Sequence, residues 1–204
     1  MAQIVRPDAR YQHSYLEALD EFAGAHRDGD GELQLAADPT TGFAGLDFTR
    51  EGLEDPDTFR RLVQARRADE LPETPRPAHF VPCTYLWIVE GDTYLGSIAF
   101  RHELTDVLLE QGGHIGYSIR PSARRQGHAS TALRQVLELA AEMGHERVLV
   151  TCDEDGRPDF SLLHGADRHG DTEGVDLRYL AFDLLRAGDR DLTGQPWERR
   201  RAEL

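Results

Sequence analysis

Residues 113–131 read GHIGYSIRPSARRQGHAST, in which an apolar run leads through a short turn into a periodic helix. Alternation of apolar residues predicts a strand over 114–120, and Pro121 ends it because proline has no amide hydrogen for a sheet ladder. The next segment predicts a helix that ends at Gly144. Its apolar stripe consists of Leu133, Val136, Leu137, Ala140 and Ala141.

The turn before this helix has small residues where a ligand would approach the main chain. Gly127 and Ala129 leave neighbouring backbone amides open, and the helix start adds unsatisfied N–H donors and the positive end of its dipole. Arg124 and Arg125 contribute charge and forked donors. These features predict a pyrophosphate site, although a solvent-facing helix start shows some of the same features.

Two other phosphate-binding turns are excluded. A P-loop requires a lysine, and all 23 basic residues of this chain are arginines. The GxGxxG turn of dinucleotide-binding domains is absent from the segment. The lack of lysine also excludes a Schiff base or a lysine nucleophile.

The remaining pattern predicts one α/β domain over residues 1–187, with a mixed sheet and helices on both faces, followed by a polar, arginine-rich tail over 188–204. In chain order the other predicted elements are a strand at 4–7, helices at 9–25 and 57–68 with a loop at 28–52 between them, a hairpin of strands at 83–90 and 93–101, a buried strand at 147–151, a helical turn at 160–163 and a strand at 175–185.

Composition limits the classes of partner. The 204 residues are 39% hydrophobic and 29% charged, which is typical of a globular domain. The net charge of -14 repels nucleic acid. No apolar run approaches the ~20 residues that cross a bilayer, and the start has no signal-peptide pattern. Cys83 and Cys152 fit neither a disulfide framework nor a zinc motif. We expect a cytoplasmic protein with no metal and no membrane partner.

The spacing Arg124-x-x-Gly127-x-Ala129 resembles the acyl-CoA signature (Q/R-x-x-G-x-G/A) of the GNAT N-acetyltransferase superfamily. The sequences at 101–104 (RHEL), 112–117 (GGHIGY) and 148–153 (VLVTCD) are similar to a bacterial subgroup of predicted acetyltransferases. The resemblance extends over roughly residues 1–153 and weakens beyond them.

This resemblance implies a mostly antiparallel central sheet that splays between the strands at 114–120 and 147–152, with acyl-CoA in the gap. The pantetheine arm would lie along main-chain groups of 118–120, and the pyrophosphate on the amides of 125–130. The residues expected to bind the coenzyme are Ser118, Ile119, Arg120, Arg124, Arg125, Gln126, Gly127, His128, Ala129, Ser130 and Thr131.

Acyl transfer to an amine needs a neutral amine, a partner for the oxyanion and a proton for the thiolate. A main-chain N–H within 117–119 can meet the oxyanion. His114 is the first candidate base because imidazole titrates near neutrality. Alternatively, His114 is a half-buried histidine held by a neighbouring backbone group. Glu103 and Glu110 are further candidates for the base.

The proton donor is harder to place. Many GNAT enzymes have a tyrosine on the helix after the strand that corresponds to 147–152, but no tyrosine occurs here between Thr151 and Arg178. Ser161 and Tyr179 are the candidates we retain as catalytic residues, with Asp159 and His164 as weaker ones. A thiolate can also leave without an acid, because a thiol has a much lower pKa than an amine.

The sequence therefore predicts an N-acyltransferase that moves an acetyl or related group from acetyl-CoA or another acyl-CoA, used as co-substrate without a metal, to a primary amine of a small molecule or peptide. The amine attacks directly in a ternary complex, at a pocket shaped by the loops at 28–52 and 71–82. The acidity favours a cationic acceptor, and a homodimer is compatible with the pattern. The alternative is a non-catalytic module that binds or senses acyl-CoA, suggested by the departure from the family pattern after Asp153.

Overall fold

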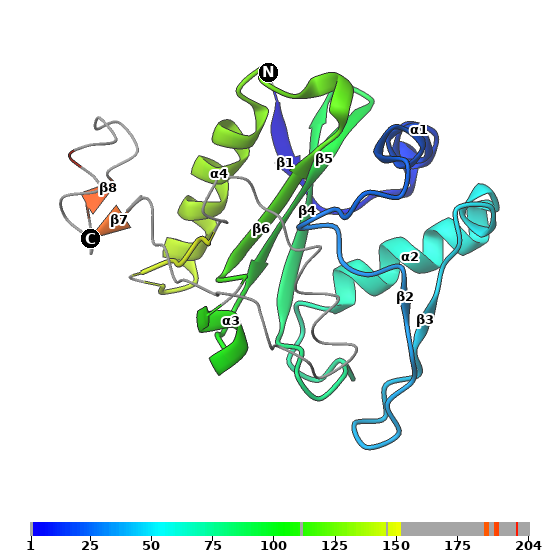
Figure 1. Ribbon diagram of the computed structural model, residues 1–204, viewed down its shortest axis with the longest axis horizontal. Coiled ribbons are helices and arrows are strands. Elements are labelled where there is room, and N and C mark those ends of the chain that lie inside the picture. The colour runs from blue at the N-terminus through cyan, green and yellow to red at the C-terminus, as the bar shows by residue number, and fades with distance from the viewer. Residues whose placement is uncertain are drawn as a thin grey trace, which may run out of the picture.

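The computed structural model describes residues 2–110, 112–145, 147–151, 186–187, 190–191 and 199. Its centre is an antiparallel sheet of four strands in the order β1-β4-β5-β6 (Figure 1). The strands are β1 (Gln3–Val5), β4 (Cys83–Glu90), β5 (Thr93–Arg101) and β6 (Ile115–Ile119). The β4–β5 hairpin is confirmed at the predicted residues, with Gly91 in the left-handed region (φ 58°) of its turn.

Strand alternation divides the core between the two faces of the sheet. On one face Ile98 and Ile115 pack with Val136 of α4 (His128–Glu142). On the other face Trp87 and Tyr94 pack with α1 (Gln12–Phe22) and α2 (Pro56–Ala68), and Figure 1 shows these two helices on the side of the sheet away from α4. The prediction of an α/β domain with helices on both faces is therefore confirmed.

Local signals explain where the helices begin and end. The Asp55 carboxylate caps α2 by accepting the Thr58 amide N–H at 2.8 Å, and Pro56 occupies the first helical position. Helix α4 ends just before Gly144, whose φ of 86° suits the residue after a helix. No helix in the described ranges is both long and apolar enough to cross a membrane.

Several predicted elements differ from the structure. The helix predicted at 9–25 is a 3-10 turn, η1 (Ala9–Tyr11), followed by the shorter α1, and the loop at 28–52 contains the hairpin β2 (Gln34–Leu35) and β3 (Leu46–Asp47). The 3-10 turn η2 (Gly52–Glu54) follows that hairpin. Helix α3 (Asp106–Glu110) was not predicted, because five residues are too few to show a helical period.

The strand predicted at 147–151 is not formed. The Leu149 N–H donates to the side chain of His114 and not to a carbonyl of a sheet ladder. The elements predicted at 160–163 and 175–185 lie outside the described residues. Near the end, β7 (Arg186–Ala187) pairs with β8 (Arg190–Asp191), and the boundary predicted between 187 and 188 directly follows β7.

Candidate acyl-CoA and acceptor site

The turn between β6 and α4 presents a row of unused backbone donors. After the 3-10 turn η3 (Pro121–Ala123), Arg125 and Gly127 both adopt left-handed conformations, with φ of 62° and 83°. Among the described residues, the N–H groups of 125–130 have no hydrogen-bond acceptor, and the next amide, that of Thr131, donates to the Gly127 carbonyl at 3.0 Å. Alternating left- and right-handed residues at a helix start form an anion-binding concavity.

Side chains of the same turn hold its shape. The Arg124 guanidinium donates through Nε to the Ile119 carbonyl at 3.0 Å and lies over the Phe22 ring, 5.8 Å from its centre. A Cβ built at Gly127 would meet no atom within 4 Å, so the approach to its amide is open. The turn therefore combines positive charge, free amides and access from solvent.

Helix α1 anchors the turn through a partly buried ion pair. The Arg120 side chain, which is 9% exposed, donates through Nε to Glu21 at 3.0 Å and through Nη1 to the Tyr94 carbonyl at 3.1 Å. The other Glu21 oxygen accepts the Ser122 amide at 3.0 Å. These bonds lower the pKa of Glu21 to about 2, chiefly because Arg120 donates to its carboxylate.

We expect the Glu21 pair to make stability depend on pH in the acid range. The pKa of Glu21 lies at about 2 in the folded protein against an ordinary value of 4.5. The stabilisation is complete above the ordinary value and is lost as pH falls through the folded one. The melting temperature of the wild type should therefore fall between pH 4.5 and 2 more steeply than that of Glu21→Gln. Glu138→Gln, at an exposed position of α4, is the control. Parallel curves for the wild type and Glu21→Gln would contradict the prediction.

Strand β6 ends the sheet next to this turn. Its inner edge pairs with β5, and no strand of the described residues pairs with its outer edge. Both main-chain groups of Arg120 are used, because its N–H donates to Leu95 at 2.8 Å and its carbonyl accepts from Ala123 at 2.9 Å. In an antiparallel ladder alternate residues direct both main-chain groups at the partner strand, so Ser118, which lies opposite Ser97, faces β5 as Arg120 does. Of the three predicted residues, an extended ligand arm is left with Ile119, whose carbonyl already accepts from Arg124 Nε at 3.0 Å.

A loop on the α1 side covers the sheet beside β6. Its Asp30 carboxylate is 2% exposed and accepts the Tyr15 hydroxyl at 2.7 Å and the Ser97 hydroxyl at 2.9 Å. Arg27 pairs with the same carboxylate at 3.1 Å. Burial raises the pKa of Tyr15, and the Asp30 charge adds to this effect, so the phenol remains a neutral donor. A Cβ at Gly29 would lie 2.3 Å from the Gly116 carbonyl, so only glycine allows this approach.

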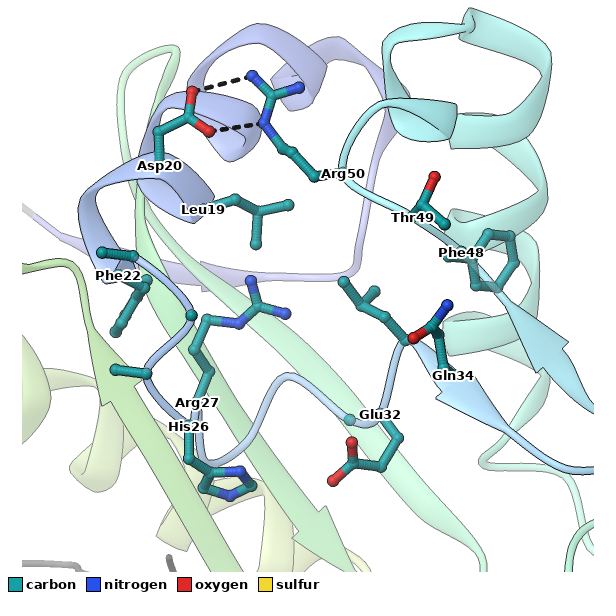
Figure 2. A pocket seen from close by; sticks show the side chains of 15 residues that line it. Leu19, Asp20, Phe22, His26, Arg27, Glu32, Gln34, Phe48, Thr49 and Arg50 are labelled. Atoms are coloured by element: carbon teal, nitrogen blue, oxygen red, sulfur yellow. Dashed lines mark hydrogen bonds and ion pairs between the residues drawn. The ribbon is translucent and has the colours of Figure 1, made fainter.

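A pocket of about 690 Å³ opens between the end of α1 and this loop (Figure 2). Figure 2 shows the Arg27 side chain extending into its centre and Arg50 paired with Asp20 at its edge. Phe22 lines the pocket and also carries the Arg124 guanidinium on its ring. The pocket is therefore adjacent to the β6–α4 turn, and the predicted loop at 28–52 supplies part of its wall.

These features agree with a comparison against protein-family models. The model described as Acetyltransferase (GNAT) domain matches residues 25–163, which is more than half of the chain. The chain belongs to the GNAT acetyltransferase family. The matched range includes the loop that carries Asp30, the strand β6 and the turn between β6 and α4.

Among the solved structures similar to this GNAT chain is a Trypanosoma brucei acetyltransferase with 13% sequence identity and a TM-score of 0.42, and the match covers 87% of this chain and 98% of that chain. A comparison with curated proteins gives no match. The GNAT assignment therefore rests on the family model.

The structure places the candidate base His114 directly before β6, with its ring hydrogen-bonded to the main chain. Its Nδ1 accepts the Leu149 N–H at 3.0 Å, so the proton of the neutral ring is assigned to Nε2 and neither nitrogen has a free lone pair. Burial lowers the pKa of His114 to about 4, helped by the charges of His145 and Arg101. This geometry favours the backbone-held alternative over the general base.

Of the other proton-transfer candidates, the structure describes Glu103 and Glu110. Glu103 and Glu110 are exposed on the segment around α3. Ser161 and Tyr179, like Asp159 and His164, lie outside the described residues.

Cys83 is buried, which raises its pKa to about 12, so it packs as a small apolar residue. Among the described residues, no group of three or more His, Cys, Asp or Glu is placed to hold a metal ion.

Sequence reasoning missed two features of this site. Asp30 lies in a segment without periodicity, and its burial depends on contacts with α1 and β5. The Glu21–Arg120 pair joins residues 99 positions apart. The one available signal was Gly29-x-Gly31, because closely spaced glycines can mark a backbone that approaches another chain segment.

Proposed function

We propose that this GNAT protein transfers an acetyl group from acetyl-CoA to a primary amine of a small molecule or peptide. Membership of the family supports acetyl transfer in general. The six free amides of 125–130 are the observation that carries the coenzyme part of the proposal. They lie at the start of a helix of 15 residues, where a diphosphate gains hydrogen bonds and the favourable dipole together.

The reaction is a direct displacement at the thioester carbonyl. The amine nitrogen forms the new C–N bond, the C–S bond breaks, and the proton lost by the amine balances the one the thiolate takes up. A main-chain N–H within 117–119 stabilises the oxyanion. Because the Nδ1 of His114 is occupied, a water or one of Glu103 and Glu110 takes the amine proton. Ser161 and Tyr179 remain the proposed donors to the sulfur, together with release of the thiolate without an acid.

The acceptor enters through the pocket between α1 and the loop that carries Asp30. The chain's net charge of -14 favours a cationic amine over an anionic one. The pocket lining does not add to this preference, because the carboxylates of Asp20 and Glu32 are balanced by the guanidinium groups of Arg27 and Arg50. We propose no further identity for the acceptor.

The test is a thiol-release assay with purified protein, acetyl-CoA and a panel of amines that includes polyamines, aminoglycosides and peptides with free amino termini. We expect release of free thiol that requires both protein and one class of amine. A reaction without amine measures background hydrolysis. Saturable binding of CoA without turnover on any amine would instead favour the acyl-CoA-sensing module.

A further inference from the structure

Among the described residues, the segment 147–151 makes hydrogen bonds to the sheet region only at residues 112–114, just before β6, while Val148 and Val150 pack on the core. The His114 N–H donates to the Leu149 carbonyl at 2.8 Å, and the Leu149 N–H donates to the Nδ1 of His114 at 3.0 Å. A third bond runs from the Gly112 N–H to the Thr151 hydroxyl at 3.0 Å. From residue 115 onward, the described residues show no hydrogen bond between β6 and this segment. His114 therefore lies where the two segments begin to separate.

The surroundings hold the His114 ring in this orientation. It stacks on Phe100 with the ring centres 6.0 Å apart and an angle of 18° between the planes, and His145 approaches it edge-on at 5.7 Å. The main chain is equally constrained, since a Cβ at Gly113 would lie 2.5 Å from the Leu149 carbonyl oxygen. The His114 carbonyl accepts the Arg101 N–H of β5 at 2.8 Å. His114 and Leu149 thus exchange two hydrogen bonds, as paired residues of a sheet do. In one of them the imidazole Nδ1 takes the place of the main-chain carbonyl that would usually accept.

We propose that His114 is a positioning residue, whose neutral ring holds residues 149–151 beside the start of β6 and so sets the gap in which the acyl-CoA of the proposed function lies. In this proposal His114 acts as a hydrogen-bond acceptor for the Leu149 N–H and does not transfer a proton in the reaction. It depends on the proposed function only for the identity of the ligand in the gap.

Protonation of the ring gives a second, independent readout. Nδ1 cannot accept the Leu149 N–H once it carries a proton, and the new charge would face Arg101 of β5 and His145 beyond α4. His102, which follows β5, contacts the same Phe100 ring as His114. The pKa of His114 in the folded protein is about 4 against an ordinary 6.5. Stability is therefore lost as pH falls from the ordinary value towards the folded one. This loss should be absent from a variant that cannot titrate at position 114.

The experiment compares two substitutions of the same residue. Asparagine places its Oδ1 close to the position of Nδ1, so H114N keeps the acceptor but cannot carry a proton, whereas H114A removes the acceptor. Amide hydrogen exchange at Leu149, acetyl-CoA affinity by calorimetry and turnover are measured for each. The control is H102N, because His102 contacts the same Phe100 ring but bonds to Thr84.

We expect H114A to exchange the Leu149 amide about tenfold faster and to bind acetyl-CoA about tenfold more weakly, the scale of one lost hydrogen bond. H114N should stay within about threefold of the wild type in all three measurements. H114Q, whose amide lies one bond further out, replaces H114A if that variant does not fold.

Two results would overturn the proposal. One is loss of turnover in H114N with unchanged exchange at Leu149, which would make His114 the base. The other is wild-type exchange in H114A. If the wild type binds no acetyl-CoA, the proposed function fails, and the exchange of Leu149 still decides whether His114 holds the segment.

Discussion

Replacement of Gly127 by valine is expected to weaken acetyl-CoA binding by about tenfold or more, since a non-glycine residue in the left-handed region costs about 1–2 kcal/mol. Gly127 has φ 83° and ψ 2° and directly precedes α4. A valine drives this residue towards negative φ and turns the amides of 125–130 away from their common focus. It also adds a Cβ on the path of a ligand. Calorimetry with acetyl-CoA measures the change.

Gly144→Val is the matched control for this experiment. Gly144 has almost the same conformation, with φ 86°, and a Cβ there also meets nothing within 4 Å. It lies at the opposite end of α4, away from the free amides. Both variants should lose similar stability, and only Gly127→Val should lose affinity. Equal acetyl-CoA affinity in the two variants would show that the β6–α4 turn does not hold the coenzyme.

Replacement of Asp30 by alanine is expected to lower the free energy of unfolding by about 3–5 kcal/mol, as is usual when one member of a buried ion pair is removed. The carboxylate is 2% exposed. Its loss leaves the Arg27 guanidinium without its counter-charge and two buried hydroxyls, those of Tyr15 and Ser97, without their acceptor. Denaturant unfolding followed by tryptophan fluorescence measures the change, because Trp87 stacks on Tyr15.

Two further variants separate the parts of this effect. Asp30→Asn keeps an acceptor oxygen while removing the charge, so its cost should be smaller than that of the alanine variant. Asp57→Ala removes a carboxylate from an exposed pair with Arg60 and should cost less than about 1 kcal/mol. A change below about 1 kcal/mol in Asp30→Ala would mean that the loop at 26–32 is not held by this network.

The hairpin of β4 and β5, the strand β6 and the end of α4 were predicted within one or two residues. Apolar alternation and the glycine and proline positions are local signals, so nearby residues suffice to indicate them. The short elements β2, β3 and α3 were not predicted, because two to five residues carry no readable period. The segment 147–151 has the β-branched and apolar residues of a strand, but a strand also needs a partner strand for its hydrogen bonds. Here the Leu149 N–H donates to the His114 side chain instead.

The amino-acid sequence by itself indicated the family, the turn of small residues before α4 and the hairpin of the sheet, since each follows from residues adjacent along the chain or spaced by a regular period. Only the tertiary structure decided which partner each polar side chain has. Arg120 meets Glu21, Asp30 meets Tyr15 and Ser97, and His114 accepts from Leu149. The physical reason is that the burial and hydrogen bonding of a polar group depend on which segments folding brings together. The spacing of residues along the chain does not show which distant segments these are.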